Sequence, residues 1–419
     1  MLRISDVCNI TSSRRIFQRE YVEREVPFYR SKEIILKSKS QPITDTLYIS
    51  RKRYEEIKSK YGVPTAGDIL LTSVGTLGIP YLVQDDEEFY FKDGNLTWFK
   101  DYNGEIRSRF LYYWLLSPIA KGQINSIKIG SSQPAVTIDS LKGMTITVPP
   151  DDVQIMILGI LSAYDDLIEN NNRRIKILEE MALTIYDEWF VKFRFPSHGK
   201  VKMVNSELGK IPEGWEVRLL SDIVETQYGY TETASEEKVG PKFVRGKDIN
   251  KTSYVDWQGV PYCKIDSDEY PKYKLKKGDI VVIRMADPGK VGIVEVDIDA
   301  VFASYLVRLK EPHNLLTTYY LFYTLLSDRY QSYISGASTG TTRKSASAGV
   351  LTGIKICIPP RKLLDMFEAQ VEPLRNLLNN LVEKNSILCR TRDILLPKLI
   401  SGEIGVEDLD IDVGDINDR

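Results

Sequence analysis

One sequence pattern occurs twice in this chain of 419 residues, and equivalent positions of the two copies lie about 210 residues apart. The segment Gly67–Leu71 returns as Gly278–Val282, at an offset of 211. Landmarks at an offset of 210 are Leu116-Ser117 with Leu326-Ser327, Gly130 with Gly340, and Val148–Pro150 with Ile358–Pro360. Near the starts, Ser5–Val7 matches Ser221–Ile223 and Tyr29–Ile34 matches Val244–Ile249, at offsets of 216 and 215. A repeat of this length indicates one folding unit present in two copies.

Each copy is predicted to mix short strands with helices. Runs rich in β-branched residues bounded by Gly and Pro predict strands at residues 69–74, 144–148 and 280–284. Apolar residues at helical spacing predict helices at 110–116 and 319–326. A Pro-Pro pair ends the last strand of each copy, because proline removes a hydrogen-bond donor from the ladder.

A long helix with a heptad seam is predicted after each Pro-Pro pair. The first seam, at alternating steps of three and four, consists of Leu161, Tyr164, Ile168, Asn171, Ile175, Leu178, Ala182 and Ile185. Adding 210 to each number gives the second seam: Val371, Leu374, Leu378, Leu381, Asn385, Leu388, Arg392 and Leu395. Two amphipathic helices in one chain are expected to pack together, antiparallel if the copies are related by an approximate twofold axis.

Two polar seam residues test this pairing. If Asn171 faces Asn385, Ile168 faces Leu388 and Ile175 faces Leu381 in the neighbouring layers. A buried Asn fixes the register of a coiled coil, because a mismatch leaves its amide unsatisfied. We therefore expect Asn171 and Asn385 in one layer; the alternative is that each amide separately reaches solvent or a partner protein.

The predicted fold class is α+β, with two similar mixed α/β domains separated by two long helices that form an antiparallel coiled coil. The expected limits are 1–150 and 196–360 for the domains, 151–195 and 361–400 for the helices, and 401–419 for an acidic tail. The first seam spans 25 residues, about 36 Å at a rise of 1.5 Å per residue. This is close to the rise of one turn of DNA, about 34 Å.

Charge and composition permit a nucleic-acid partner. The net charge is −2, but seven carboxylates and one arginine give residues 401–419 a charge of −6, so residues 1–400 carry +4. Four separated cysteines and two histidines predict neither a disulfide framework nor a metal site. Without a signal sequence or a membrane-spanning apolar run, the chain is expected to be cytoplasmic.

Sequences typical of catalysis are missing. Asp151 and Arg361 follow the Pro-Pro pairs, where an adenine methyltransferase loop would have an aromatic residue. The segment Asp287–Gly292 lacks the spacing of a phosphate-binding loop. Nor is there a recognisable nucleophile turn, so we expect no catalytic residues.

The arrangement resembles the specificity subunits of type I restriction-modification enzymes. The likeness depends on the repeated Gly-Asp-Ile, the Pro-Pro ends of both domains, Gly209–Trp215 at the start of the second copy, and Leu395–Gly402 at the end of the second helix. Two target-recognition domains, each followed by a helical spacer, are typical of that family.

The resemblance implies a non-catalytic subunit that binds double-stranded DNA, each domain reading one half of a bipartite site. It implies two methyltransferase subunits bound to the spacer helices, with two motor-nuclease subunits able to join. S-adenosylmethionine, which supplies the methyl group for adenine, would be held by the methyltransferase subunit, so no cofactor is expected in this chain.

Candidate DNA contacts are basic and small polar residues in matching places of the two copies. Arg30 and Lys32 match Arg245 and Lys247 and are predicted to contact the DNA backbone, with Lys290 a further phosphate contact. Ser73 and Arg284 follow the Gly-Asp strands, and Arg284 is predicted to read a guanine. The matching loops supply Ser131, Ser132 and Gln133 in the first copy and Thr341, Thr342, Arg343 and Lys344 in the second.

Two other functions fit the same sequence. The chain could be the target-recognition module of another modification or nuclease system. Alternatively, it could be a two-headed scaffold that holds protein partners and binds no DNA. Affinity for DNA falls steeply with salt, and this dependence would distinguish a DNA-binding chain from a scaffold.

Overall fold

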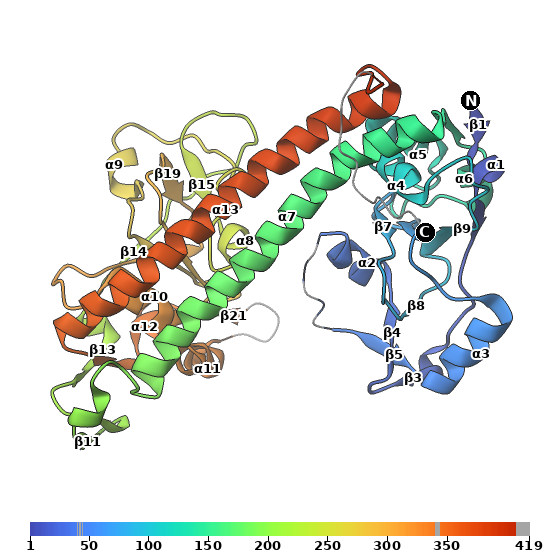
Figure 1. Ribbon diagram of the computed structural model, residues 1–419. Coiled ribbons are helices and arrows are strands. Elements are labelled where there is room, and N and C mark those ends of the chain that lie inside the picture. Colours follow the sequence, from blue (N-terminus) through green and yellow to red (C-terminus); the bar gives the residue numbers. More distant parts are fainter. Residues whose placement is uncertain (40, 42, 44, 340–343, 408–419) are drawn as a thin grey trace. The chain divides into compact units, whose positions relative to one another are not determined.

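The computed structural model describes residues 1–407 except 40, 42, 44 and 340–343 (Figure 1). The chain divides into two compact units, one of Met1–Leu167 with the segment from Cys389 onward, and one of Ile168–Leu388. Each unit contains one mixed α/β domain and part of each of the two long helices.

The first unit is built on a four-stranded antiparallel sheet in the order β2-β9-β6-β7. Its strands are β2 (Asn9–Thr11), β9 (Leu96–Lys100), β6 (Ile69–Thr72) and β7 (Pro80–Leu82). A second sheet, in the order β3-β5-β4-β8, contains β3 (Tyr21–Val22), β5 (Leu47–Ile49), β4 (Val26–Tyr29) and β8 (Tyr90–Phe91). The pair β1 (Leu2–Arg3) and β10 (Thr145–Ile146) is separate. The helices are α1 (Ile4–Val7), α2 (Ser31–Lys37), α3 (Arg51–Tyr61), α4 (Ser108–Leu116), α5 (Pro118–Ile127) and α6 (Ile138–Lys142).

The second unit has a matching antiparallel sheet in the order β14-β20-β16-β18. Its strands are β14 (Glu225–Tyr228), β20 (Leu306–Lys310), β16 (Ile280–Ile283) and β18 (Val291–Ile293). The two-stranded pairs are β11 (Met203–Ser206) with β12 (Gly209–Pro212), β13 (Glu216–Leu219) with β22 (Lys355–Ile358), β15 (Lys242–Val244) with β19 (Ala300–Phe302), and β17 (Met285–Ala286) with β21 (Lys344–Ser345). The helices are α8 (Gly246–Ile249), α9 (Tyr270–Tyr273), α10 (Thr318–Leu326), α11 (Asp328–Ala337) and α12 (Ala348–Thr352).

Strand register repeats together with the sequence. Ile69 lies opposite Phe99 in the first sheet, and Ile280 lies opposite Leu309 in the second, so both members of the pair recur at offsets of 211 and 210. In both units a helix of nine residues follows the sheet, α4 in the first and α10 in the second. The predicted α+β fold with two similar domains is confirmed.

The repeated Gly-Asp forms a turn that leads into the central strand. Gly67 and Gly278 have φ of +86° and +94°, a conformation that favours glycine. The next residue caps the turn: an Asp68 carboxylate oxygen accepts the backbone N–H of Thr65, and Asp279 accepts that of Lys276, both at 2.9 Å. The motif therefore has a structural role in both units.

The long helices α7 (Asp151–Tyr186) and α13 (Arg361–Ser401) are antiparallel neighbours (Figure 1). In the second unit Asn171 of α7 meets Asn385 of α13. Ile175, Leu178, Leu378 and Leu381 form an apolar cluster beside them. As residue numbers rise along α7, those of the facing residues on α13 fall, which confirms the predicted antiparallel pairing.

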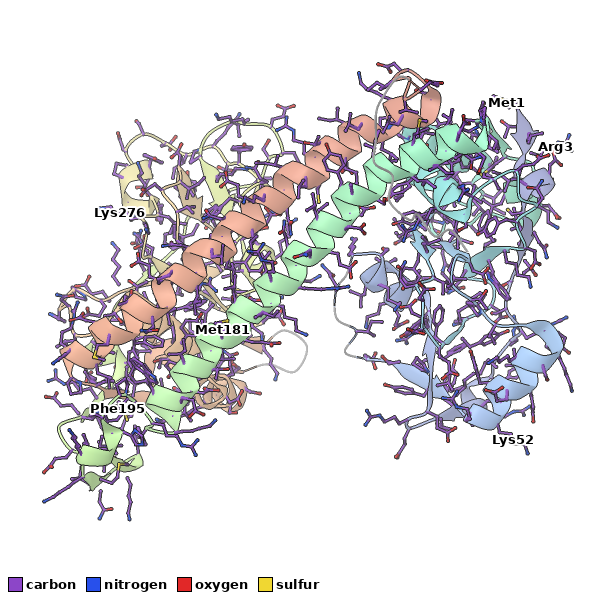
Figure 2. The ribbon with its side chains drawn as sticks, viewed as in Figure 1. Met1, Arg3, Lys52, Met181, Phe195 and Lys276 are labelled. Atoms are coloured by element: carbon purple, nitrogen blue, oxygen red, sulfur yellow. The ribbon has the colours of Figure 1, made fainter. Side chains whose placement is uncertain are left out.

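Helix α7 ends in a π-helical turn, Asp187–Val191, and the chain then enters the second domain. Phe195, labelled in Figure 2, lies with its ring centroid 5.7 Å from that of Trp215. Phe190 and Phe367 belong to the same buried aromatic cluster, where their rings meet edge to face at 4.9 Å. These contacts attach both long helices to the core of the second domain.

Candidate nucleic-acid interface

In each unit a hairpin loop returns to the residue that follows the Gly-Asp strand. In the first unit the Ser73 carbonyl accepts the N–H of Val136 at 3.0 Å. In the second, the Arg284 carbonyl accepts the N–H of Ala346 at 2.9 Å. The loops close through equivalent bridges, Ile129 with Ala135 and Thr339 with Ser345. The two places predicted from the repeat therefore adjoin each other in both units.

The predicted contacts of the hairpin loops that the structure describes are exposed to solvent. Ser131, Ser132 and Gln133 are exposed between α5 and α6. In the second unit, Lys344 is exposed at the start of β21. The other predicted contacts of this loop, Thr341, Thr342 and Arg343, lie outside the described residues.

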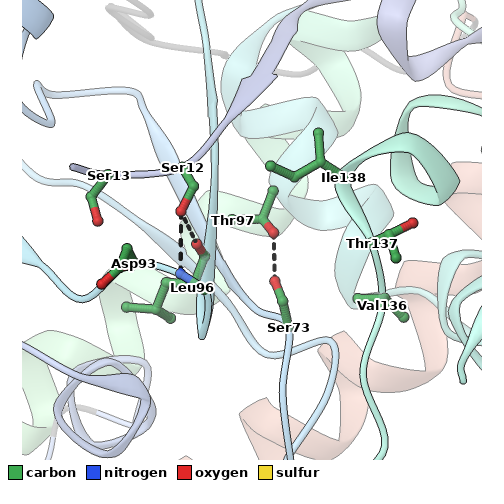
Figure 3. A pocket seen from close by; sticks show the side chains of 10 residues that line it. Ser12, Ser13, Ser73, Asp93, Leu96, Thr97, Val136, Thr137 and Ile138 are labelled. Atoms are coloured by element: carbon green, nitrogen blue, oxygen red, sulfur yellow. Dashed lines mark hydrogen bonds between the residues drawn. The ribbon is translucent and has the colours of Figure 1, made fainter. Parts of the chain in front are cut away.

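Ser73 lies at the edge of a hollow of about 370 Å³ in the first domain (Figure 3). Only 3% of its surface is exposed, and its hydroxyl bonds Thr97 Oγ1 at 2.5 Å and the Leu71 carbonyl at 3.1 Å. Ser13 Oγ is buried and has no hydrogen-bond partner among the described residues. The lining consists of Ser12, Ser13, Ser73, Asp93, Gly94, Leu96, Thr97, Val136, Thr137 and Ile138. The lining thus combines five hydroxyl side chains with one carboxylate and three aliphatic side chains.

Strand register identifies the matching place in the second domain. Ser12 follows β2, and Tyr228 ends β14; these strands pair with β9 and β20 in the same register, so the two residues correspond. Ser73 corresponds to Arg284 by the offset of the Gly-Asp strands. Two small hydroxyl side chains in the first unit are therefore replaced by an aromatic ring and a guanidinium in the second.

Arg284 and Tyr228 stack on each other at this place. The guanidinium carbon lies 4.9 Å from the ring centroid, and Tyr228 is 44% exposed. The Tyr228 hydroxyl accepts the N–H of Ala348 at 3.2 Å, which holds the ring against the start of α12. Arg284 Nε is buried without a hydrogen-bond partner among the described residues. A guanidinium over a ring, with Nε left without a partner among the described residues, is suited to bind an acceptor on a ligand.

Tyr228 was not among the predicted contacts. An aromatic residue at the end of a short strand is most often part of the core, and the sequence around Glu225–Tyr228 has no motif that separates the two cases. Only the register of β14 against β20 places its ring beside Arg284.

Arg30 and Arg245 occupy equivalent places directly before α2 and α8. Each backbone N–H donates to the acid three residues on, Glu33 or Asp248, at 2.8 Å. The guanidinium groups bond the same acids, at 2.6 Å for Arg30 and 3.0 Å for Arg245 at the nearest. These arginines therefore stabilise the first helical turn, and their charge is partly neutralised within the domain.

Four predicted lysines are exposed. Lys32 and Lys247 lie on the first turns of α2 and α8, and Lys290 and Lys344 lie in the turn before β18 and at the start of β21. Lys32 Nζ is 3.8 Å from an oxygen of Asp45, an exposed pair of small energetic weight. Their long side chains are accessible to phosphate groups.

The two seam asparagines are hydrogen-bonded. Asn171 Nδ2 donates to Asn385 Oδ1 at 2.8 Å, and Asn385 Nδ2 donates to Asn172 Oδ1, also at 2.8 Å. Asn171 is 8% exposed. The amides lie in one layer between the apolar contacts of the helices, and each uses its donor on a neighbouring amide.

The described parts of the chain contain no group of three or more His, Cys, Asp or Glu side chains arranged to hold a metal ion. Over the same residues, no helix combines the length and apolar character needed to cross a membrane.

Comparison with known proteins gives a consistent result. Residues 1–180 and 212–371 match the family described as "Type I restriction modification DNA specificity domain". The MjaIX specificity subunit of Methanocaldococcus jannaschii is 30% identical over 317 residues, which cover 73% of this chain and 71% of that protein. The HindI specificity subunit of Haemophilus influenzae is 22% identical over 402 residues, covering 81% of this chain and 86% of that protein.

Among solved structures, the S subunit of a type I restriction-modification system from M. genitalium has the same fold. The TM-score is 0.56 at 15% sequence identity, and the superposition covers 95% of this chain and 94% of the other. The family match spans both copies of the repeat. The chain therefore belongs to the family of type I restriction-modification specificity subunits, which are non-catalytic.

Proposed function

We propose that this chain recognises a bipartite DNA site, with residues 1–150 reading one half and residues 196–360 the other. Partner subunits would then methylate an adenine or cleave the DNA. The observation that carries the proposal is the pair of equivalent hairpin loops beside Ser73 and Arg284. The scaffold is the same at both places and the side chains differ, as reading two different half-sites requires.

The residues divide into two groups by the contacts they can make. Lys32, Lys247, Lys290 and Lys344 are exposed cations suited to phosphates. Arg30 and Arg245 would contact the DNA backbone in a supporting role, because Glu33 and Asp248 already pair with their guanidinium groups.

Base reading is assigned to the strand ends and the hairpin loops. Arg284 carries two terminal nitrogens that match the O6 and N7 acceptors of guanine. Ser131, Ser132 and Gln133 would contact the other half-site, with Thr341, Thr342 and Arg343 in the corresponding loop. Ser73 would act through the shape of the hollow, because its hydroxyl is already bonded.

The helices at 151–195 and 361–400 would act as the spacer, with Asn171 and Asn385 fixing their register, and residues 401–419 as an acidic tail. Two methyltransferase subunits would bind along them, with S-adenosylmethionine in those subunits, and two motor-nuclease subunits could join. The complex would act in the cytoplasm.

The test is methylation mapping in cells. The chain is expressed together with a cognate methyltransferase subunit, and modified adenines are located by long-read sequencing. We expect one split sequence motif that disappears when the chain is omitted. Replacing Ser131, Ser132 and Gln133 with Ala should relax one half of the motif only. An undivided motif, or a pattern independent of the chain, would refute the proposal.

The scaffold alternative makes a different prediction. Binding of the purified chain to duplex DNA, followed by fluorescence anisotropy, should weaken as salt rises, because each neutralised phosphate releases counterions. A two-headed protein scaffold would show no binding at any salt concentration.

A further inference from the structure

A short segment of the second domain is bonded to both long helices of its unit. Ser253 donates its hydroxyl and its backbone N–H to Glu179 of α7. Three residues further on, the Asp256 carboxylate accepts the hydroxyl of Ser386 from α13 at 3.1 Å. Between them, Tyr254 packs on the apolar cluster of the two helices. The segment Ser253–Asp256 thus contacts α7 and α13 together.

Arg375 of α13 connects this segment to the residues that follow strand β18 of the same domain. Its side chain is fully buried, and it forms two parallel bonds to Glu295, from Nε at 2.8 Å and from Nη2 at 2.6 Å. The remaining donors bond the hydroxyl of Ser253 at 2.8 Å and its carbonyl at 2.7 Å. The guanidinium lies over the ring of Phe322, 5.3 Å from its centroid. One side chain of the helix is therefore fixed by three separate parts of the domain.

Stability alone does not account for this group. A buried ion pair loses the hydration of both charges, and apolar residues of similar volume are often as stabilising or more so. What an apolar pair cannot supply is direction: the planar fork of arginine matches a carboxylate in one orientation only. The network is suited to fixing the angle between the second domain and helix α13.

The first unit has a different group at the matching position. Subtracting 210 from 375 leads to Asp165 of α7, which accepts the hydroxyl of Tyr113 at 2.6 Å and pairs with Arg392 of α13. Its side chain is 32% exposed, whereas that of Arg375 is 0% exposed. Both units attach a domain at this helix position, and only the second does so with a fully buried bidentate pair.

We infer that Arg375, together with Glu295 and Ser253, is a positioning group that fixes the angle of the second domain on the paired helices. This inference rests on the proposed function in one respect. A step of one base pair turns the half-site by about 35°, so an enzyme whose domain could rotate by that angle would accept more than one spacer length. The network would thus determine the length of the unread spacer between the half-sites.

The test replaces both charges at once, as Arg375→Met with Glu295→Met. A single replacement would leave one buried charge unpaired and endanger folding, whereas the double replacement keeps the volume apolar. The matched control is Arg218→Met, which breaks an exposed pair with Glu216 of 2.7 Å in the same unit. Among the residues that the structure describes, the side chains of these three positions bond Glu216, Glu295, Arg375 and Ser253, none of which is a predicted DNA contact.

Methylation mapping is the first readout. The wild type and the control should modify one spacer length. The double variant should modify the same two half-sequences, with a preference for the original spacer over one longer or shorter by a base pair that is lower by at least about tenfold. An unchanged spacer preference in a folded double variant would overturn the inference. Absence of any split motif in the wild type would instead refute the proposed function.

The second readout needs no DNA. Spin labels incorporated at the exposed positions Lys247 and Glu383 report the distance between the second domain and α13. The wild type and Arg218→Met should give one narrow distribution, and the double variant a broader one. A distribution as narrow as that of the wild type would overturn the inference even if the proposed function failed.

Discussion

Asp68 and Asp279 form a matched pair in which one substitution should have two different effects. Both residues cap the same turn, but their second partners differ. Asp68 accepts the indole N–H of Trp98 at 2.9 Å, whereas Asp279 accepts Nη1 of Arg308 at 3.0 Å. Trp98 and Arg308 occupy the same position of strands β9 and β20. The perturbation is Asp→Asn at each site.

In the second unit the change removes a charge from a buried pair. Arg308 is 3% exposed, and its other acceptors are the neutral amide of Gln227 and the carbonyls of Lys272 and Lys274. Leaving a buried charge without its partner costs about 3–5 kcal/mol. Because these neutral acceptors remain, we expect a loss near the lower limit, about 3 kcal/mol for Asp279→Asn.

In the first unit the same change should cost little. The amide oxygen of Asn can still accept the indole N–H and the backbone N–H of Thr65, so we expect a change within about 1 kcal/mol. Burial raises the pKa of Asp68 above its ordinary value of 3.8, despite the hydrogen bonds that lower it. The folded state therefore holds the proton more tightly than the unfolded state. Asp68 therefore contributes least to the free energy of unfolding when its carboxylate is ionised. As the pH falls through the folded pKa toward 3.8, protonation of Asp68 stabilises the folded state.

Native-state hydrogen exchange of the full chain reports each unit separately. Amides of β16 should lose protection in Asp279→Asn, and those of β6 should change little in Asp68→Asn at neutral pH. Lowering the pH toward 4 should stabilise the wild-type first unit relative to Asp68→Asn, since only the wild type gains from protonation. Equal losses in the two variants at neutral pH would refute the assignment of the cost to Arg308.

Three other predictions concern separate parts of the chain. Asn171→Leu should destabilise the helix pair by about 1–3 kcal/mol in urea unfolding, because it leaves the amide of Asn385 short of a partner. Changing both residues to Leu should recover that loss, and a double variant as unstable as the single one would contradict the shared layer. Arg284→Ala should lose about 1–3 kcal/mol of discrimination at one base of the second half-site, seen by methylation mapping, with the first half-site as an internal control. Cys8 should resist a thiol reagent at pH 8 in the folded chain, because burial raises its pKa to about 12; labelling as fast as in urea would contradict this.

The fold was predictable from the sequence because its signals are periodic. The match of Gly67 with Gly278 at a fixed offset predicted two similar domains, and the structure gives them sheets of the same strand order and register. The heptad seams likewise placed Asn171 near Asn385 once the helices were taken as antiparallel. Both inferences use spacing along the chain, and a repeat shows the same spacing twice.

The candidate site was predictable only in part, because its contacts join distant positions. The acid partner of Arg30 lies three residues away and is visible in the sequence as an Arg-x-x-Glu spacing. The partner of Arg375 lies 80 residues away along the chain, and their contact depends on how the domain packs on its helix. Ser73 was proposed as a contact because it follows a strand, and only the sheet register shows its hydroxyl bonded to Thr97.

The two units show where one scaffold keeps the role of a side chain and where it lets side chains differ. Within the sheet, Trp98 and Arg308 differ in chemistry and still perform the same task, since each donates an N–H to the aspartate that caps the turn. At the end of the sheet no such task is shared: Ser73 bonds within a hollow, and Arg284 stacks on a tyrosine. Substitutions inside the sheet must preserve a donor, whereas those at its end need only leave the strand and the returning loop in place. Under the proposed function, the residues that read the two half-sites are therefore expected to diverge at the strand ends and loops. The length between the half-sites would be set by the helices and by the groups that fix each domain on them.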